Sequence, residues 1–161
     1  MPPPTLQSEL KKRQPFDCPA EEAYLNLVRT AGVLSGEFAA LFKAHGLSES
    51  TYNVLRILRG AKRGESAEGL PSLEVAERLV TRVPDITRLV NRLIEAGLAS
   101  RCRADDDRRV ARVSITPAGL EVLRRLDRPV RRLHTRQLGH LGAEELATLN
   151  RLLEKARRAP G

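Results

Sequence analysis

Residues 102–116, CRADDDRRVARVSIT, set three consecutive carboxylates beside two consecutive arginines and continue into an alternating apolar stretch. Such a cluster could hold a cation, act as a catalytic acid and base, or bring arginines to an anion. A Mg²⁺ or Ca²⁺ site needs several oxygen ligands that converge on one point. Asp105, Asp106 and Asp107 lack the glycine and distal glutamate of an EF-hand loop, and Arg108 and Arg109 oppose a cation. The sequence therefore predicts no metal site.

Catalytic use of these carboxylates lacks the groups that would complete it. No nucleophile motif or glycine-rich phosphate loop accompanies them, and His45, His134 and His140 are dispersed along the chain. The two cysteines, Cys18 and Cys102, do not form the C-x-x-C spacing of a zinc or redox centre. We therefore expect neither an enzyme nor a bound cofactor.

The overall charge favours an anionic partner. Lys and Arg number 28 against 20 Asp and Glu, a net charge of +8, which suits nucleic acid or an acidic membrane surface. No run approaches the roughly 18 apolar residues of a membrane span, and the first twenty residues lack the apolar core of a secretory signal, so we expect a cytoplasmic protein. Aromatic residues make up 3% of the chain, with no Trp, which favours duplex DNA over stacked single strands.

The length and the 41% hydrophobic content predict one globular domain. Residues 1–19, rich in proline with a basic cluster, are predicted to be a flexible N-terminal arm, and residues 20–161 the single domain. Apolar residues at spacings of three or four predict a helix over about 20–45 and another from Ser48 to just before Gly60. The stretch Gly64–Pro71 is expected to be a loop.

The next segment predicts two helices joined by about four residues. Ser72 is expected to cap a short helix over Leu73–Leu79. Pro84 is expected to open the second helix, with Asp85 complementing the helix dipole and Gly97 supplying the left-handed end.

Beyond Gly97 the apolar period changes from helical to alternating. Leu98–Arg103 and Val110–Ile115 are strand candidates, so the acidic and basic cluster lies at a hairpin tip. Thr116 and Pro117 begin a long helix, with a kink at Pro129 and an end near Leu138. A final helix with a stripe of leucines follows Gly142. Its apolar side is expected to pack either against a partner chain or within the same chain.

This order of elements is that of a winged helix-turn-helix, a mainly α fold with a small antiparallel β-hairpin. The second helix of such a motif enters the major groove of DNA. Its side opposite the apolar stripe carries Asp85, Arg88 and Arg92; we assign Arg88 to bases and Arg92 to phosphate. The alternative is that both arginines are ordinary solvated residues, or that Asp85 pairs with Arg88.

In a winged helix-turn-helix, the residues at the hairpin tip can also contact DNA. A carboxylate there can brace an arginine by a charge-assisted hydrogen bond, holding its guanidinium for the narrow minor groove. A solvated charged loop is the alternative reading of the same residues.

Two segments carry a resemblance to a known family: VAERLVTRVPDITRLVNRLIEAGLASR, residues 75–101, and DDRRVARVSITPAGLEVL, residues 106–123. Together they resemble the MarR family of transcription regulators over about residues 20–158. The matching positions are Ala76, Thr87-Arg88, Gly97-Leu98, Asp106-x-Arg108 and Thr116-Pro117-Ala118-Gly119.

The resemblance implies a triangular homodimer that binds a near-palindromic operator, usually as a repressor, and responds to a small effector or an oxidant. The winged helix-turn-helix would cover about residues 48–116, and the dimerisation helices about 20–45 and 117–158.

The resemblance also assigns roles to side chains. Arg108 would enter the minor groove with Asp106 as its brace, Arg109 would contact phosphate, and Thr87 would lie near the DNA backbone. Arg82 stands where the family commonly has serine, which puts a local helix cap in doubt and adds a possible DNA contact.

Three alternatives remain open. Some family members sense peroxide through a cysteine near the start of the first helix, and Cys18 lies close to that region. The negative charge of the neighbouring Asp17 opposes formation of the thiolate that oxidation requires. Cys102 is expected to be a small packing residue. A winged-helix module that contacts an acidic protein, or a protein that coats DNA without sequence preference, would also fit the basic charge.

Overall fold

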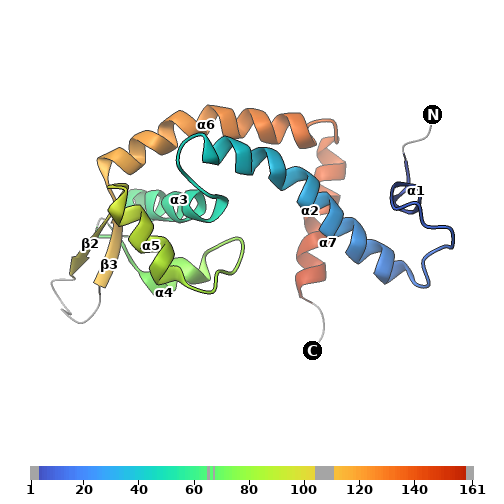
Figure 1. The fold of residues 1–161 in the computed structure, drawn as a ribbon, viewed down its shortest axis with the longest axis horizontal. Coiled ribbons are helices and arrows are strands. Elements are labelled where there is room, and N and C mark those ends of the chain that lie inside the picture. Colours follow the sequence, from blue (N-terminus) through green and yellow to red (C-terminus); the bar gives the residue numbers. More distant parts are fainter. Residues whose placement is uncertain (1–3, 65, 67, 104–110, 159–161) are drawn as a thin grey trace.

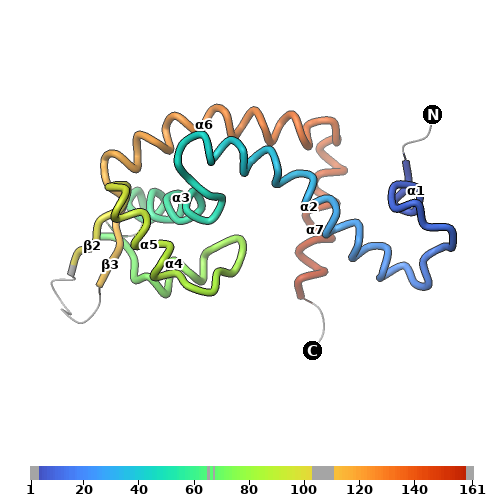
Figure 2. The backbone as a smooth tube through the Cα atoms, viewed as in Figure 1, coloured from blue at the N-terminus to red at the C-terminus, as the bar shows by residue number. Residues whose placement is uncertain are grey.

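The structure is a computed structural model, and it describes residues 4–64, 66, 68–103 and 111–158. Within these residues the chain forms a globular lobe at one end and an extended helical arm at the other (Figures 1 and 2). Its elements are, in order, α1 (Leu6–Glu9), α2 (Pro19–Lys43), α3 (Glu49–Gly64), β1 (Leu70–Pro71), α4 (Ser72–Glu77), α5 (Ile86–Glu95), β2 (Ala99–Arg103), β3 (Ala111–Ile115), α6 (Pro117–Leu138) and α7 (Ala143–Arg157). None of the described helices is long and apolar enough to cross a membrane.

The globular lobe contains the elements from α3 to β3, and the helices α2 and α6 run side by side from it into the arm (Figure 1). Polar contacts join the two long helices: Gln137 Nε2 donates to the Leu34 carbonyl at 3.0 Å, and Arg136 pairs with Glu37 at 2.7 Å. The hydrogen bonds from Arg136 and then Gln137 lower the pKa of Glu37. α6 continues through Pro129 as one helix, and its path bends along its length (Figure 1).

The sheet has three strands in the order β1-β3-β2, all antiparallel, so the expected hairpin has gained a third strand. Leu70 pairs with Val113, which corrects the prediction of a loop over Gly64–Pro71. A Leu-Pro pair after glycine has the composition of a turn, and only the free edge of β3 makes it a strand. Gly69 permits the approach: its φ is +96°, and a Cβ there would lie 2.1 Å from the Val113 carbonyl oxygen.

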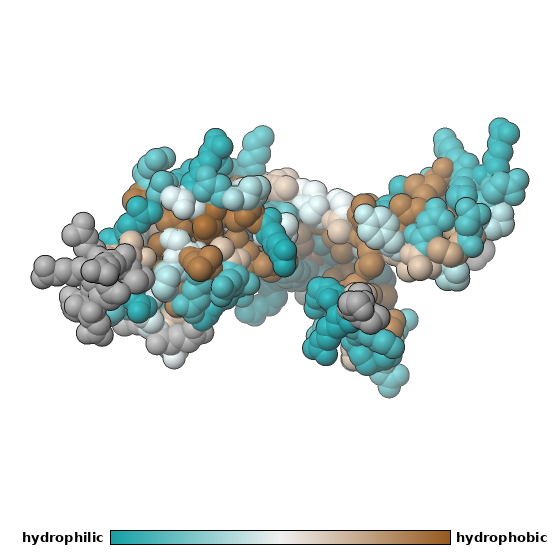
Figure 3. Space-filling view, turned by 90° about the horizontal axis from the view of Figure 1, so that it is seen from below, coloured by the Kyte–Doolittle hydropathy of each residue, from teal (hydrophilic) through white to brown (hydrophobic). Residues whose placement is uncertain are grey.

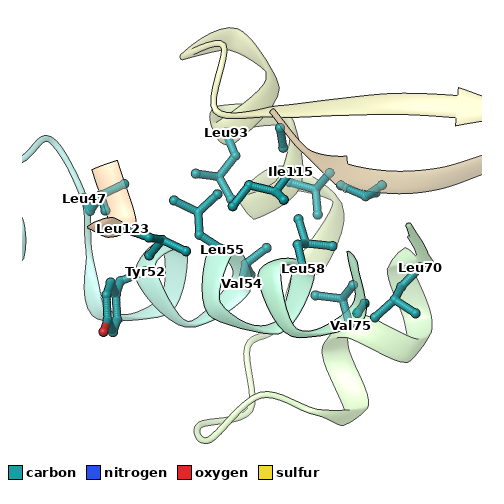
Figure 4. Close-up of a cluster of buried hydrophobic side chains, with 14 of the residues drawn as sticks. Leu47, Tyr52, Val54, Leu55, Leu58, Leu70, Val75, Leu93, Ile115 and Leu123 are labelled. Carbon is teal, nitrogen blue, oxygen red and sulfur yellow. The ribbon is translucent and has the colours of Figure 1, made fainter. Parts of the chain in front are cut away.

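The lobe is held together by one apolar core. Side chains from α3, α5, β3 and α6 converge on it, and Figure 4 shows Leu55, Leu93 and Ile115 directed toward one another. α3 continues past Gly60, where the sequence predicted its end, as far as Gly64. The reason is that its apolar face continues: Ala61 is fully buried in this core.

A charged contact fastens α3 to α6 beside this core. Arg59 donates two hydrogen bonds to Asp127, each 2.8 Å long, while only 10% of the Arg59 side chain is exposed. The hydrogen bond from Arg59, with the arginine's charge, holds the pKa of the Asp127 carboxyl below its ordinary value, and the pair raises the pKa of Arg59. Two bonds in parallel also fix the direction of both side chains.

Both ends of α4, and a short helix near the N-terminus, differ from the sequence predictions. Ser72 is the first residue of α4 rather than its cap: Pro71 occupies the cap position and makes no side-chain hydrogen bond. α4 also ends at Glu77, two residues before the predicted Leu79. Within the predicted N-terminal arm, residues Leu6–Glu9 form the short α1, and Glu9 pairs with Arg29 of α2 at 2.5 Å.

Candidate nucleic-acid interface and the adjoining cavity

The start of α5 is fixed by the side chain of Asp85. Asp85 is in the extended conformation, and its Oδ1 accepts a hydrogen bond from the Arg88 backbone N–H at 2.9 Å. It is therefore the N-cap, and Pro84 lies one residue before the cap instead of opening the helix. A carboxylate at this position satisfies an N–H that the helix leaves unpaired and suits the positive end of its dipole.

α5 presents one apolar and one polar side, as its sequence predicted. Val90 and Leu93 are buried in the core, with Ile86 and Leu89 partly buried beside them. The opposite side carries exposed polar residues: Thr87, Arg88, Asn91, Arg92 and Glu95. Arg82 is also exposed, in the connection between α4 and α5. The structure thus brings Thr87, Arg88 and Arg92 together on one open surface, in reach of an external partner.

Two further polar residues belong to this surface and were absent from the sequence predictions. Arg101 on β2 donates a hydrogen bond to Asn91 Oδ1 at 3.0 Å, which joins the wing to α5. The i, i+3 spacing from Arg88 is a signal that could have identified Asn91. Arg101 could be identified only from the packing of β2 against α5. Asn91 matters chemically because an asparagine amide can bond both N6 and N7 of adenine.

The wing follows α5 directly. Gly97, with φ +70°, ends the helix, and β2 then pairs with β3 in register from Ala99–Ile115 to Arg103–Ala111. The predicted wing-tip residues Asp106, Arg108 and Arg109 lie outside the described residues.

Thr116 connects the wing to α6. Its Oγ1 accepts from the Gly119 N–H at 3.1 Å, which caps α6, and donates to the Gly97 carbonyl at 2.7 Å. One hydroxyl therefore holds together the exit of α5 and the start of α6, so the orientation of the wing and that of the long helix are linked.

The two cysteines lie in different environments. Cys18 is exposed and caps α2, its sulfur accepting from the Glu21 N–H at 3.3 Å. Cys102 on β2 is partly buried, and its thiol donates to the Glu68 carbonyl at 3.0 Å. A redox role for Cys18 stays a prediction. In the part of the chain that the structure describes, no three His, Cys, Asp or Glu side chains gather as metal ligands would.

A cavity of about 400 Å³ lies between α2, α3, α6 and the segment 79–81 that leads toward α5. Its wall is aromatic: the rings of Phe42 and Tyr52 stack with centroids 4.2 Å apart, and Phe38 lies 5.9 Å from Phe42. His134 of α6 lies 4.7 Å from Phe38, and Glu49 at the start of α3 completes the ionisable lining among the described residues. Volume and lining suit a small organic ligand.

Comparison with models of known protein families gives no match. A crystal structure of a MarR transcription factor from Planctomyces limnophilus is 45% identical to this chain, covers 87% of it and 98% of its own length, and has a TM-score of 0.64. The PcaV transcriptional regulator of Streptomyces coelicolor, solved with its natural ligand, is 25% identical, with 91% and 98% covered and a TM-score of 0.68.

A curated relative agrees with these structures. The HTH-type transcriptional repressor IacR of Pseudomonas putida is 30% identical over 128 residues, 80% of this chain and 73% of that protein. Since both the sequence identity and the winged helix-turn-helix geometry agree over most of the chain, this protein belongs to the MarR family of DNA-binding transcription regulators.

Proposed function

We propose that this chain acts as a cytoplasmic homodimeric repressor that binds a near-palindromic duplex operator and responds to a small effector. The observation that carries the proposal is the open polar side of α5, where Thr87, Arg88, Asn91 and Arg92 stand exposed on a helix whose start is capped. Side chains near the start of such a helix are those that reach base edges in the major groove.

The roles at this surface follow from side-chain chemistry. Arg88 reads a base, since a guanidinium can bond guanine O6 and N7 together, while Arg92 binds phosphate. By the family resemblance, Thr87 lies near the DNA backbone, and Arg82 adds a further DNA contact. Asp85 acts through the helix start that it caps, because its Oδ1 already accepts a hydrogen bond there.

We assign the wing tip by the family resemblance. Arg108 enters the minor groove with Asp106 as its brace, and Arg109 binds phosphate. The antiparallel pairing of β2 with β3 supports this assignment, because it places Arg103 and Ala111, the strand ends that flank these residues in the sequence, opposite each other.

Dimerisation is supported by the uncovered apolar faces of the arm. α7 has fifteen residues and buries none of its side chains within the described chain. Figure 3 shows hydrophobic surface on the arm as well as on the lobe. The large exposed apolar side chains of α2 and α7 are Tyr24, Leu27, Val28, Val33, Leu149 and Leu152. An amphipathic helix gains most of its stability from packing this face, and a second copy supplies the surface to pack against.

Repression and effector response are supported by two relatives and by the position of the aromatic cavity. One relative is named as a repressor, and PcaV was solved with its natural ligand. The aromatic cavity borders segment 79–81, which leads toward α5, so an occupant could move the DNA-reading helix.

The experiment that tests this function is selection of bound duplexes from a random pool by the purified protein. A specific regulator enriches a near-palindromic sequence and prefers it to random duplex by on the order of 10³ or more. A protein that coats DNA enriches no sequence, and a module that contacts acidic proteins retains no duplex; either result would overturn the proposal.

The selected duplex then allows a test of the wing. Arg108→Ala is expected to weaken binding by about 1–3 kcal/mol at fixed salt, because a lost groove contact is worth that much. Asp105→Ala, at a neighbouring carboxylate without an assigned role, is the matched control and should leave the affinity nearly unchanged. Unchanged affinity in the Arg108 variant would remove its assigned role.

A further inference from the structure

The cavity between α2, α3 and α6 has a lining that is unusual for this chain. The whole protein has five aromatic residues, three Phe and two Tyr, and three of them, Phe38, Phe42 and Tyr52, line this one cavity. Phe42 stacks on Tyr52, and these two rings are only 4% and 8% exposed, so they back the cavity, while the partly buried Phe38 presents its ring to an occupant. The ring of Phe38 suits a flat aromatic ligand, since offset stacking adds to the burial of apolar area.

The charge of the lining is the opposite of the charge of the chain. Lys and Arg outnumber Asp and Glu by 28 to 20 in the sequence, yet none of the described residues that line the cavity is a lysine or an arginine. The lining contains one carboxylate, Glu49, and one imidazole, His134. An organic anion would meet a carboxylate here and no lysine or arginine to pair with, so the electrostatics disfavour it.

Arg56 is near the aromatic wall but has its own partner. Its guanidinium donates to the Tyr52 hydroxyl at 3.2 Å and lies 6.0 Å from the centre of that ring, and Arg56 is not part of the lining. This contact occupies Arg56 at the hydroxyl end of Tyr52. Phe38 and Glu49 then set the preference of the cavity for a ligand.

We propose that this cavity binds a planar aromatic cation, with the positive charge held by the ring of Phe38 and by the carboxylate of Glu49. The negative face of an aromatic ring attracts a cation, and the attraction grows where water is excluded. A volume of about 400 Å³ is enough for a ligand of two or three fused rings. The inference rests on the proposed function only for its consequence, the coupling of this ligand to DNA through segment 79–81.

The charge preference can be measured with three two-ring compounds of nearly equal size. 1-Methylquinolinium is a cation, 1-naphthylmethanol is neutral and 1-naphthoate is an anion at neutral pH. Titration calorimetry on the full chain is expected to give the cation an affinity at least about fivefold higher than that of the anion. Equal affinities, a preference for naphthoate, or no binding of the cation up to about 1 mM would each overturn the inference.

Two variants assign the preference to the cavity. Glu49→Gln is expected to lower the affinity for 1-methylquinolinium about two- to fivefold, as for a partly exposed ion pair, and to leave that for 1-naphthylmethanol unchanged. Phe38→Leu keeps an apolar side chain but removes a ring face. It should therefore lower the affinity for 1-methylquinolinium more than the affinity for 1-naphthylmethanol. Glu154→Gln, on the exposed side of α7, is the matched control and should change neither affinity. An unchanged cation affinity in both cavity variants would also overturn the inference.

Affinity for the selected duplex, measured with and without 1-methylquinolinium, separates the two proposals. Duplex binding together with a failed cation preference refutes the ligand class and leaves the regulator intact. A cation preference that depends on Glu49, in a protein that binds no duplex, supports the ligand class and refutes the proposed function.

Discussion

At the scale of single residues, the exposed side of α5 combines two arginines with different expected tasks. Arg88 lies in the first turn of α5, three residues after the N-cap Asp85, and Arg92 lies one turn further along the helix. A base contact distinguishes sequences, whereas a phosphate contact strengthens binding to every sequence. The two arginines should therefore be separable by comparing a selected duplex with a random one.

Arg88→Ala is expected to lower affinity for the selected duplex by about 1–3 kcal/mol and to reduce the preference over random duplex. Arg92→Ala is the matched control: it should weaken both duplexes about equally and lower the salt slope of the affinity by about one. Fluorescence anisotropy at several salt concentrations measures both quantities. Equal weakening of both duplexes by Arg88→Ala would contradict its base contact.

The pair of Arg59 with Asp127 makes a second prediction at residue scale. Asp127→Asn removes the negative charge opposite a guanidinium that is 10% exposed, so the free energy of unfolding at pH 7 should fall by about 1–3 kcal/mol. Glu121→Gln, which breaks the exposed ion pairs with Arg124 and Arg125, is the control. It should lower the free energy of unfolding by less than Asp127→Asn does. Urea unfolding measures both variants, and an equal loss in the two would contradict the role of the buried arginine.

The same pair has a pH dependence of defined sign. The pKa of Asp127 is lowered in the folded protein, so the stabilisation is fully present above the ordinary carboxyl pKa of about 4 and is lost as the pH falls through the lower folded value. The difference in stability between the wild-type chain and Asp127→Asn should therefore shrink as the solution is acidified. A difference that stays constant down to about pH 2 would contradict this assignment.

At the scale of elements, the start of α6 packs against the exit of α5 with no spare room. A Cβ at Gly119 would lie 2.3 Å from the Leu98 carbonyl oxygen and 2.8 Å from Cγ1 of Ile115. The Leu98 carbonyl belongs to the backbone, so it cannot move away as the end of a flexible side chain could. Only glycine at position 119 therefore permits this close packing. The close approach, together with the Thr116 hydroxyl, holds the wing at a fixed position relative to α6.

Gly119→Ala is accordingly expected to destabilise the fold by about 1–3 kcal/mol, the usual cost of overpacking a core. Gly36→Ala is its control, since a Cβ there meets nothing within 4 Å and the position lies inside α2. That change should stabilise the chain by about 0.5–1 kcal/mol through helix propensity. Thermal and urea unfolding report both values; a neutral Gly119→Ala would show that the junction can relax.

At the scale of the whole molecule, the arm exposes large apolar side chains that no other described residue covers. Leu149 and Leu152 of α7 are 37% and 50% exposed, and Val33 and Tyr24 of α2 are exposed as well. The globular lobe has its own apolar core. The arm extends beyond the lobe (Figure 1), and its apolar side chains are exposed. A homodimer formed through the arm would bring two α5 helices to the two halves of a near-palindrome.

Leu152→Glu, combined with Leu149→Glu, is expected to convert a dimer into a monomer and to abolish tight binding of the selected duplex. The charges would be buried in the contact, and one lobe alone keeps only half of the DNA contacts. Ala147→Glu, on the opposite side of α7, is the control and should remain dimeric. Light scattering gives the mass directly, and a wild-type chain that is monomeric at high concentration would contradict the assembly.

Local sequence was sufficient for most of the helices and for part of the interface. The positions of α2, α5, α6 and α7, the strands β2 and β3, and the polar side of α5 follow from apolar period and caps, which depend on residues a few positions apart. Asp85, Cys18 and Thr116 each bond an N–H three residues further along the chain. Interactions of this range are fully represented in a short stretch of sequence.

Tertiary packing decided what those stretches could not. β1 forms because β3 has an edge with which it can pair. α3 continues past Gly60 because Ala61 is buried in the core. Arg101 can donate a hydrogen bond to Asn91 only because β2 packs on α5. Arg59 and Asp127 are 68 residues apart in the sequence, and the aromatic wall combines Phe38 and Phe42 of α2 with Tyr52 of α3. The amino-acid sequence by itself therefore determined the family, the polar side of α5 and the strands β2 and β3, through short-range patterns. The third strand, the ion pair of Arg59 with Asp127 and the cavity depend on contacts between distant segments, which only the folded chain brings together.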